Sequence, residues 1–155
     1  LTLADEAILE KMLAIVDEAK IDHSLIEIEI TESSDMLDRE LMGMITKQIR
    51  EAGFLLSLDD FGSNYTNLAS LTQVDMNVLK LDKSLVDGIC QNRISKSVVK
   101  SVLDFCKEMN ITSLSEGVEM KEQVELLVQL GCNLIQGYYY GRPMPVDAFT
   151  KQWLK

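Results

Sequence analysis

Short apolar runs alternate along the chain with segments in which apolar residues recur every three or four positions. The runs predict strands over residues 25–30, 54–59, 77–82, 111–115 and 133–138. Strands that alternate with helices indicate βα units and a parallel sheet. We therefore predict an α/β fold in one domain, because no linker and no low-complexity segment divides the chain.

The intervening segments show the period of an amphipathic helix. The residues predicted to face inward are Ile8, Met12, Ile15, Val16 and Ala19, then Leu41, Met44, Ile45 and Ile49, then Val98, Val102, Cys106 and Met109, and finally Val124, Leu127 and Val128. Asp35 is a candidate cap for the second helix, and Gly53 and Gly131 are expected to end two helices. Short helices are expected from Tyr65 to Leu71 and after Pro145.

Two strands separate charged from apolar residues. In residues 26–30 the isoleucines share one face and the glutamates the other, and in residues 78–82 the leucines oppose Lys80 and Asp82. Helices are expected to cover the apolar face. The charged face would line a barrel or crevice, or it would be the solvent-facing side of a two-layer sheet, an arrangement that is rare for parallel strands.

Polar residues follow every predicted strand, where the loops of a parallel sheet build binding sites. These residues are Glu29, Glu32, Asp59, Asp60, Lys80, Asp82, Glu116, Glu119 and Gln136. Carboxylates are hard oxygen ligands that suit Mg²⁺ or Mn²⁺, and a pair of such ions can activate water and stabilise charge on a phosphate. Lys80 is unusual in an apolar strand, and beside carboxylates it could orient water or neutralise phosphate charge.

Each of these residues also has a structural interpretation. A single acid can cap a helix or lie in a solvated loop, and Glu119 precedes a helix whose dipole favours a carboxylate. Gly62 and Asn64 suit positive φ, so residues 60–67 are typical of a tight functional loop. Tyr138 and its two neighbours could stack on a base, although packing is the commoner role of aromatic residues.

The composition excludes several kinds of function. The chain has 155 residues, 46% of them hydrophobic, and a net charge of −10, which argues against binding to DNA or RNA polymers. No apolar run reaches the ~18 residues of a membrane span, so no membrane contact is expected from this segment, although other domains of the parent protein could attach it to a membrane. Three widely spaced cysteines indicate reduced thiols in a cytoplasmic protein. One histidine, His23, makes a catalytic triad or a histidine-rich zinc site implausible, and we interpret it as a loop residue.

These motifs resemble, in order and spacing, the EAL-domain phosphodiesterases of cyclic di-GMP. The matching segments are Glu29-Ile30-Thr31-Glu32-Ser33, Asp59-Asp60-Phe61-Gly62, Leu79-Lys80-Leu81-Asp82, Glu116-Gly117-Val118-Glu119, Gly131-Cys132, Gln136-Gly137-Tyr138 and Arg142-Pro143-Met144-Pro145. The resemblance runs from about Leu3 to Trp153. It implies a modified TIM barrel that hydrolyses cyclic di-GMP to the linear dinucleotide with Mg²⁺ or Mn²⁺.

The resemblance also implies roles for individual residues. Glu29 and Asp59 would be metal ligands, Asp60 would bind a second metal, and Lys80 would contact the attacking water. Glu116 would be a metal ligand or base, and Glu119 and Gln136 would complete the metal and water shell. Glu32 would anchor the loop that begins Phe61, Gly62, Ser63, Asn64, Tyr65 and ends at Leu68, which in the family couples the site to dimerisation.

The chain departs from the family pattern at its start. The signature Glu-Ala-Leu strand is absent, and Glu6-Ala7-Ile8 lies on a predicted helix. About five βα units are present where a TIM barrel has eight. We therefore expect residues 1–155 to be the C-terminal portion of an EAL domain, an incomplete barrel that is weakly active or inactive alone. Open strand edges and apolar surface predict self-association.

Smaller departures lie within the matching segments. Asn64 and Ser115 stand where the family prefers glycine and alanine, and Met120 replaces the usual capping threonine. Two other functions fit less of the sequence. A degenerate EAL domain would bind cyclic di-GMP or a partner protein as a sensor without catalysis. A receiver-like signalling domain also uses paired aspartates and a lysine, but it leaves the segments 116–119 and 136–138 unexplained.

Overall fold

The computed structural model of the chain describes residues 6–31, 39–63, 71 and 74–154. Five parallel strands form one sheet in the order β1-β2-β3-β4-β5, so each strand pairs with its neighbours in sequence. The strands are β1 (Glu27–Thr31), β2 (Leu55–Phe61), β3 (Val78–Leu81), β4 (Thr112–Ser115) and β5 (Leu134–Ile135). The predicted α/β class with parallel units is confirmed.

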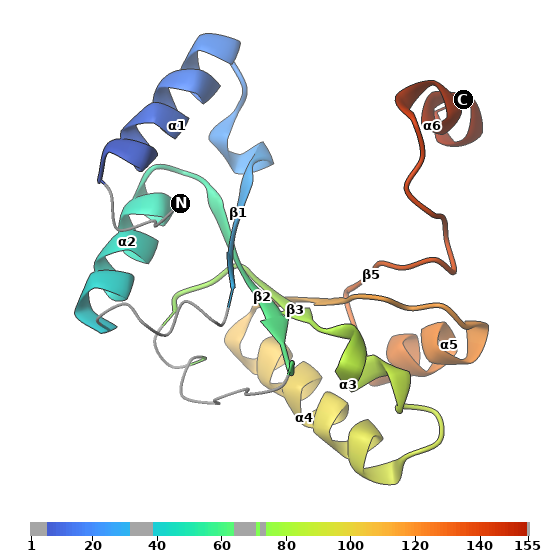
Figure 1. Ribbon diagram of the computed structural model, residues 1–155. Coiled ribbons are helices and arrows are strands. Elements are labelled where there is room, and N and C mark those ends of the chain that lie inside the picture. Colours follow the sequence, from blue (N-terminus) through green and yellow to red (C-terminus); the bar gives the residue numbers. More distant parts are fainter. Residues whose placement is uncertain (1–5, 32–38, 64–70, 72–73, 155) are drawn as a thin grey trace.

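Helices precede and connect the strands (Figure 1). They are α1 (Glu6–Ala19), the 3-10 helix η1 (His23–Leu25), α2 (Arg39–Glu51), α3 (Lys83–Asp87), α4 (Arg93–Met109), α5 (Lys121–Leu130) and α6 (Val146–Trp153). Helices α1 and α2 lie near β1, α4 and α5 lie at the other end of the sheet, and α6 stands apart at the end of an extended tail. None of the described helices combines the length and apolar composition that a membrane crossing requires.

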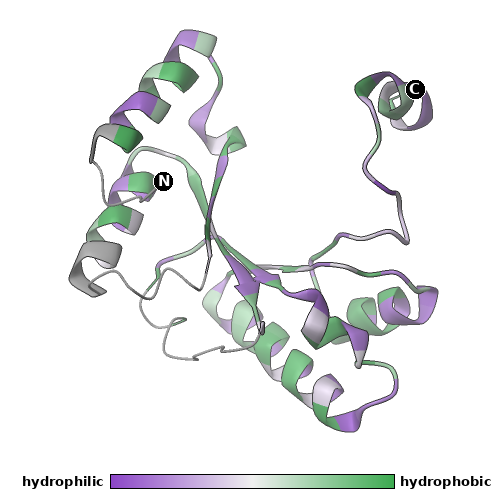
Figure 2. Cartoon of the chain, in the orientation of Figure 1, coloured by the Kyte–Doolittle hydropathy of each residue, from purple (hydrophilic) through white to green (hydrophobic). Residues whose placement is uncertain are grey.

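The helices cover one face of the sheet, as the alternation of residues predicts. One apolar cluster joins β1 and the start of β2 to α1 and α2, and includes Ile28, Ile30, Leu56, Val16, Ile45 and Ile49. A second joins β2, β3, α4 and α5, and includes Leu58, Leu79, Leu81, Val99, Leu103 and Leu127. Hydrophilic and hydrophobic residues share each helix (Figure 2), as expected of helices that pack on a sheet with one side only.

The buried stripes of the helices are narrower than predicted. Six residues expected to face inward are exposed, namely Ile15, Ala19, Met44, Val98, Met109 and Val128. In α4 the buried residues are Val99, Val102, Leu103 and Cys106, so Val102 and Cys106 are buried as predicted and the buried stripe is turned toward Val99 and Leu103. Gly53 and Gly131 follow α2 and α5, as expected. Asp35 and the predicted short helix before Leu71 lie outside the described residues.

Strand β5 is shorter than the predicted strand over residues 133–138. Only Leu134 and Ile135 join the ladder with β4. Beyond them the backbone bonds to the preceding loop instead, since the Val118 N–H donates to the Gln136 carbonyl at 3.1 Å and the Tyr139 N–H donates to the Val118 carbonyl at 3.0 Å. This exchange fastens the loop after β4 to the loop after β5.

His23 has a structural role, and it lies in the 3-10 helix η1 rather than in a loop as predicted. Its Nδ1 lies 2.6 Å from the Ala52 carbonyl and its Nε2 lies 2.9 Å from Asp17 Oδ1. The ring stacks on Phe54 with centroids 4.9 Å apart. The bond to the Ala52 carbonyl, supported by Asp17, raises the pKa of His23 above its ordinary value. The histidine thus ties α1 to the turn before β2, away from the charged face.

Candidate active site

Lys80 stands at the centre of the charged face. It lies on β3 with only 8% of its side chain exposed. Its Nζ is 2.7 Å from Glu29 Oε1, 3.0 Å from Asp59 Oδ1 and 3.0 Å from Glu116 Oε1. The acids come from β1, from β2 and from the residue after β4, so residues far apart in sequence meet because parallel strands end at one edge. Glu29, Asp59, Lys80 and Glu116 form what we call the Lys80 cluster.

The Lys80 cluster carries more negative than positive charge, since three carboxylates surround one ammonium group. Burial disfavours the charged lysine, but hydrogen bonds to Glu29, Glu116 and Asp59 outweigh burial and raise the pKa of Lys80 above its ordinary 10.5. Because the folded-state pKa is raised, the stabilisation is complete at neutral pH and is lost only in strong alkali. Lys80 therefore stays protonated wherever phosphodiester chemistry would be assayed.

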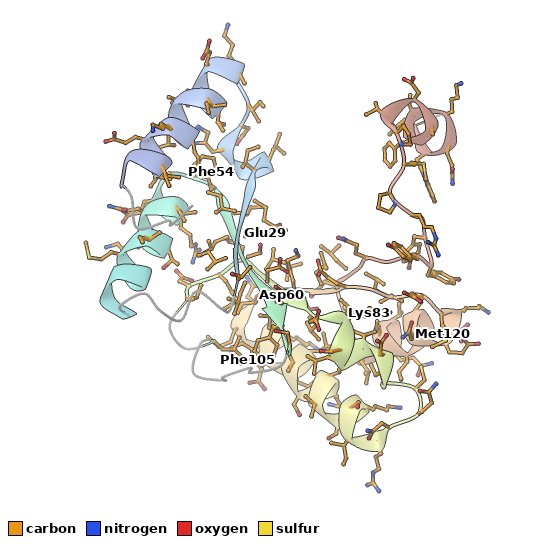
Figure 3. All side chains as sticks on the ribbon, viewed as in Figure 1. Glu29, Phe54, Asp60, Lys83, Phe105 and Met120 are labelled. Carbon is orange, nitrogen blue, oxygen red and sulfur yellow. The ribbon has the colours of Figure 1, made fainter. Side chains whose placement is uncertain are left out.

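The backbone at Asp60 separates two consecutive carboxylates. Asp60 has a φ of +59° and lies within an irregularity in the pairing of β2 with β3, between Leu58 and Phe61. Its N–H donates to Asp59 Oδ1 at 2.9 Å. Left-handed backbone is uncommon outside glycine, although aspartate and asparagine tolerate it best. The turn leaves Asp60 exposed at the end of β2 (Figure 3), whereas Asp59 reaches Lys80.

Glu119 is held by a second lysine. Lys83 Nζ lies 2.9 Å from Glu119 Oε1 and 3.0 Å from Asp87 Oδ1. Asp82, which the sequence places on the charged face, instead caps α3 by accepting from the Ser84 N–H at 2.9 Å. Figure 3 shows Lys83 at the start of α3, at the end of β3. The structure therefore brings Glu29, Asp59 and Glu116 together around Lys80, whereas Glu119 pairs with Lys83.

Gln136 is exposed, and its backbone serves the sheet. Its N–H donates to the Ser115 carbonyl at 2.9 Å. Its side chain lines a pocket of about 750 Å³ together with Tyr138, Arg142 and Trp153. The Arg142 guanidinium lies 4.5 Å from the centre of the Tyr138 ring. The tail and α6 form part of the wall of this pocket.

The loop after β2 is described only at its start. Phe61 is buried, Gly62 has a φ of +99° and Ser63 N–H donates to the Asp60 carbonyl at 3.1 Å. Ser84 Oγ donates to the Gly62 carbonyl at 3.1 Å, which ties the loop to α3. Glu32, Asn64 and Tyr65 lie outside the described residues.

Sequence reasoning missed two residues near the Lys80 cluster. Ser57 is fully buried on β2, and its Oγ has no hydrogen-bond partner among the described residues. It pairs in register with Glu29, so it shares the charged face. The sequence signal for Ser57 was its position two residues before Asp59, because alternate residues of a strand lie on the same face. Lys83 was missed because a lysine after a strand is ordinarily a solvated residue.

The Lys80 cluster has the donor chemistry of a divalent-cation site. Its three acids present hard oxygen ligands and an excess of negative charge, which Mg²⁺ and Mn²⁺ prefer. In the described part of the chain no group of three or more acids, histidines or cysteines already has the geometry of a metal site. The acids are directed at Lys80 instead, so a cation would have to draw at least one of them away from the lysine.

Comparison with known proteins identifies the family. The sequence profile of the EAL domain matches residues 1–143. The chain belongs to the EAL-domain family. The cyclic di-GMP phosphodiesterase PdeR of Escherichia coli K12 is 31% identical over 153 residues, which are 99% of this chain and 23% of PdeR. The bifunctional diguanylate cyclase/cyclic di-GMP phosphodiesterase MucR of Pseudomonas aeruginosa is 33% identical over 136 residues, 85% of this chain and 20% of MucR.

Solved EAL structures share the fold. The MucR phosphodiesterase in complex with c-di-GMP superposes with a TM-score of 0.86 at 29% identity, covering 96% of this chain and 60% of that chain. The manganese/cy-diGMP complex of Klebsiella pneumoniae BlrP1 gives a TM-score of 0.83 at 30% identity, covering 89% of this chain and 35% of that chain. This EAL chain thus spans about a quarter or less of the full lengths of PdeR and MucR.

Proposed function

We propose that this chain carries the catalytic carboxylates of an EAL-type phosphodiesterase, which hydrolyses cyclic di-GMP to the linear dinucleotide with Mg²⁺ or Mn²⁺. The observation that carries the proposal is the convergence of Glu29, Asp59 and Glu116 on Lys80 Nζ, each within 3.0 Å. The names of PdeR and MucR and the ligands in the MucR and BlrP1 structures support the substrate and the use of a metal. We further propose that residues 1–155 are the C-terminal portion of the catalytic domain.

The residues divide into those that hold the metal and those that handle water. Glu29 and Asp59 would hold one divalent ion, Glu116 would be a further ligand or the base, and Asp60 and Glu119 would extend the site toward a second ion. When bound, such ions supply Lewis-acid stabilisation of charge on the phosphate oxygens. Gln136 would complete the water shell, and Glu32 would anchor the loop over residues 61–65.

Cytoplasmic location remains our proposal, and it agrees with the three free cysteines of the chain.

Lys80 is fully engaged in the structure. An ammonium group has three N–H donors, and three carboxylates lie within hydrogen-bond distance of Nζ. Lys80 can therefore donate to water or to a phosphate oxygen only when a carboxylate turns away. In the hydrolysis, Glu116 acting as the base accepts a proton from the attacking water, the water oxygen forms a bond to phosphorus as one phosphodiester P–O bond breaks, and the departing oxygen takes up a proton from solvent.

Hydrolysis of cyclic di-GMP by the purified chain tests the proposal. We expect weak turnover that requires Mn²⁺, because the carboxylate that the family supplies from its signature strand is absent. Glu116→Gln should lower the rate at least about a hundredfold, the usual effect of removing a general base. Glu108→Gln, an exposed position on α4, is the control and should leave turnover unchanged. Equal turnover by Glu116→Gln would contradict the proposal. Binding of cyclic di-GMP without turnover, both by this chain and by a longer chain that includes the signature strand, would favour the sensor function.

We also propose that the chain self-associates. Strands β1 and β5 each pair on one side only among the described residues. Helix α6 has no buried residue, and it exposes Phe149 and Trp153. Unpaired edges and apolar helix faces favour association between copies. Sedimentation equilibrium at micromolar concentrations should report a species larger than 17.5 kDa, and a stable monomer would contradict this expectation.

A further inference from the structure

Two lysines near the end of β3 form ion pairs with two glutamates that follow β4. Lys80 pairs with Glu116 at 3.0 Å and Lys83 pairs with Glu119 at 2.9 Å. The lysines are three residues apart across the end of β3, and the glutamates are three residues apart in the loop between β4 and α5. Only the first pair belongs to the Lys80 cluster. The second pair is half-exposed, and neither the proposed chemistry nor the motif assigns a role to Lys83.

Lys83 contacts the loop with its stem as well as its charge. Its Nζ lies 3.4 Å from the Gly117 carbonyl oxygen. A Cβ added to Gly117 would lie 2.6 Å from both Cβ and Cγ of Lys83, so the lysine stem rests on the Gly117 backbone. Gly117 has a φ of +64° and directly follows Glu116. Lys83 therefore packs on the backbone directly after Glu116, whose own N–H donates to the Leu81 carbonyl of β3 at 3.0 Å.

The other side of the same loop is fastened to β5. Val118 N–H donates to the Gln136 carbonyl, and the Val118 carbonyl accepts from the Tyr139 N–H. Gln123 closes the end of the loop, because its Oε1 accepts from the N–H groups of Glu119 and Met120 at 2.9 Å. Gln123 Nε2 also donates to the Val86 carbonyl of α3 at 3.4 Å, so Gln123 links the end of the loop to α3 and Lys83 links the part next to Glu116.

We propose that Lys83 is a positioning residue: it fastens the loop over residues 116–119 to α3 and so sets the place of Glu116 in the Lys80 cluster. The inference rests on the proposed function only where it concerns metal binding. Asp87, four residues along α3, holds the lysine from the other side at 3.0 Å and directs it toward the loop. Both ion pairs raise the pKa of Lys83, so it remains charged at neutral pH.

The direction in which the affinity for Mn²⁺ changes in a Lys83 variant separates a positioning role from a purely electrostatic one. Lys83→Met keeps most of the stem and removes a positive charge close to Glu119. If Lys83 acted through charge alone, the variant would bind Mn²⁺ more tightly than the wild-type chain. If Lys83 positions the loop, the variant binds Mn²⁺ about tenfold more weakly in spite of its more favourable charge, as happens when residues that orient metal ligands are lost.

The experiment combines Mn²⁺ titration by electron paramagnetic resonance with amide hydrogen exchange of the metal-free chain. We expect exchange at Val118 and Tyr139 to be at least about tenfold faster in Lys83→Met, and Lys83→Arg to restore both readouts. Lys100→Met is the matched control, since Lys100 also pairs with an acid four residues along its helix, at 2.5 Å from Asp104. It should change neither readout.

Each outcome decides the proposal. Wild-type exchange rates in Lys83→Met, or Mn²⁺ binding that is unchanged or tighter, would overturn it. If the wild-type chain binds no Mn²⁺, the proposed function fails, and the exchange rates of the metal-free chain alone then decide the role of Lys83.

Discussion

Replacing Lys80 with methionine is expected to lower the free energy of unfolding by about 2 kcal/mol at pH 7. Removing one partner of a buried ion pair costs roughly 3–5 kcal/mol. We expect less here because Glu29 is 50% exposed, which lets water screen part of the repulsion. Urea unfolding measures the change. Addition of Mn²⁺ should stabilise Lys80→Met more than the wild-type chain, since the carboxylates no longer have to leave the lysine.

Lys121→Met is the matched control for this substitution. Lys121 pairs with Glu125 at 3.1 Å, but both side chains are more than half exposed. Surface pairs of this kind contribute at most about 1 kcal/mol. Equal stability of the Lys80 and Lys121 variants would mean that the three carboxylates do not depend on Lys80, and the account of the cluster would fail.

Gly137→Ala is expected to cost about 3 kcal/mol of unfolding free energy, at the upper end of the range for overpacking. An added Cβ would lie 2.0 Å from the Val118 carbonyl oxygen and 2.3 Å from the Val118 nitrogen. These are backbone atoms that also bond to Gln136 and Tyr139, so no side chain can move aside. The substitution should therefore separate the loops after β4 and β5, and it should reduce Mn²⁺ binding together with stability.

Gly43→Ala serves as the control for the glycine substitution. Gly43 lies within α2, and a Cβ there would meet nothing within 4 Å. Alanine is a better helix former than glycine, so this variant should be more stable by about 0.5–1 kcal/mol. Thermal unfolding midpoints of the two variants should move in opposite directions. A Gly137→Ala protein as stable as the wild-type chain would show that the two loops are not in close contact.

The sequence predicted the class of fold better than the details of its surface. Strict alternation in residues 26–30 identified the face that β1 buries, and the structure confirms it with Ile28 and Ile30 buried. Helical period alone could not resolve the exact rotation of α4 about its axis, so Val98 was predicted inward where Val99 is buried. The last strand was predicted too long because its backbone bonds turn to Val118, a contact distant in sequence.

The convergence of charged residues was also visible in the sequence, for a physical reason. Parallel strands bring their carboxyl ends to one edge, so Glu29, Asp59 and Glu116 could be expected near Lys80. Which acids touch the lysine depends on backbone details that no pattern reports, such as the positive φ of Asp60. The ion pair of Lys83 with Glu119 and the pairing of Ser57 with Glu29 join residues more than 25 positions apart, and they were not predictable from local spacing.

The most direct test of the central claim is Mn²⁺-induced broadening of the amide resonances of the chain. The account predicts that the amides of Glu29, Asp59, Lys80 and Glu116 lose intensity first, at substoichiometric Mn²⁺, and that cyclic di-GMP strengthens the effect. Equal broadening at exposed acids throughout the chain would show that the Lys80 cluster is no cation site and would contradict the account.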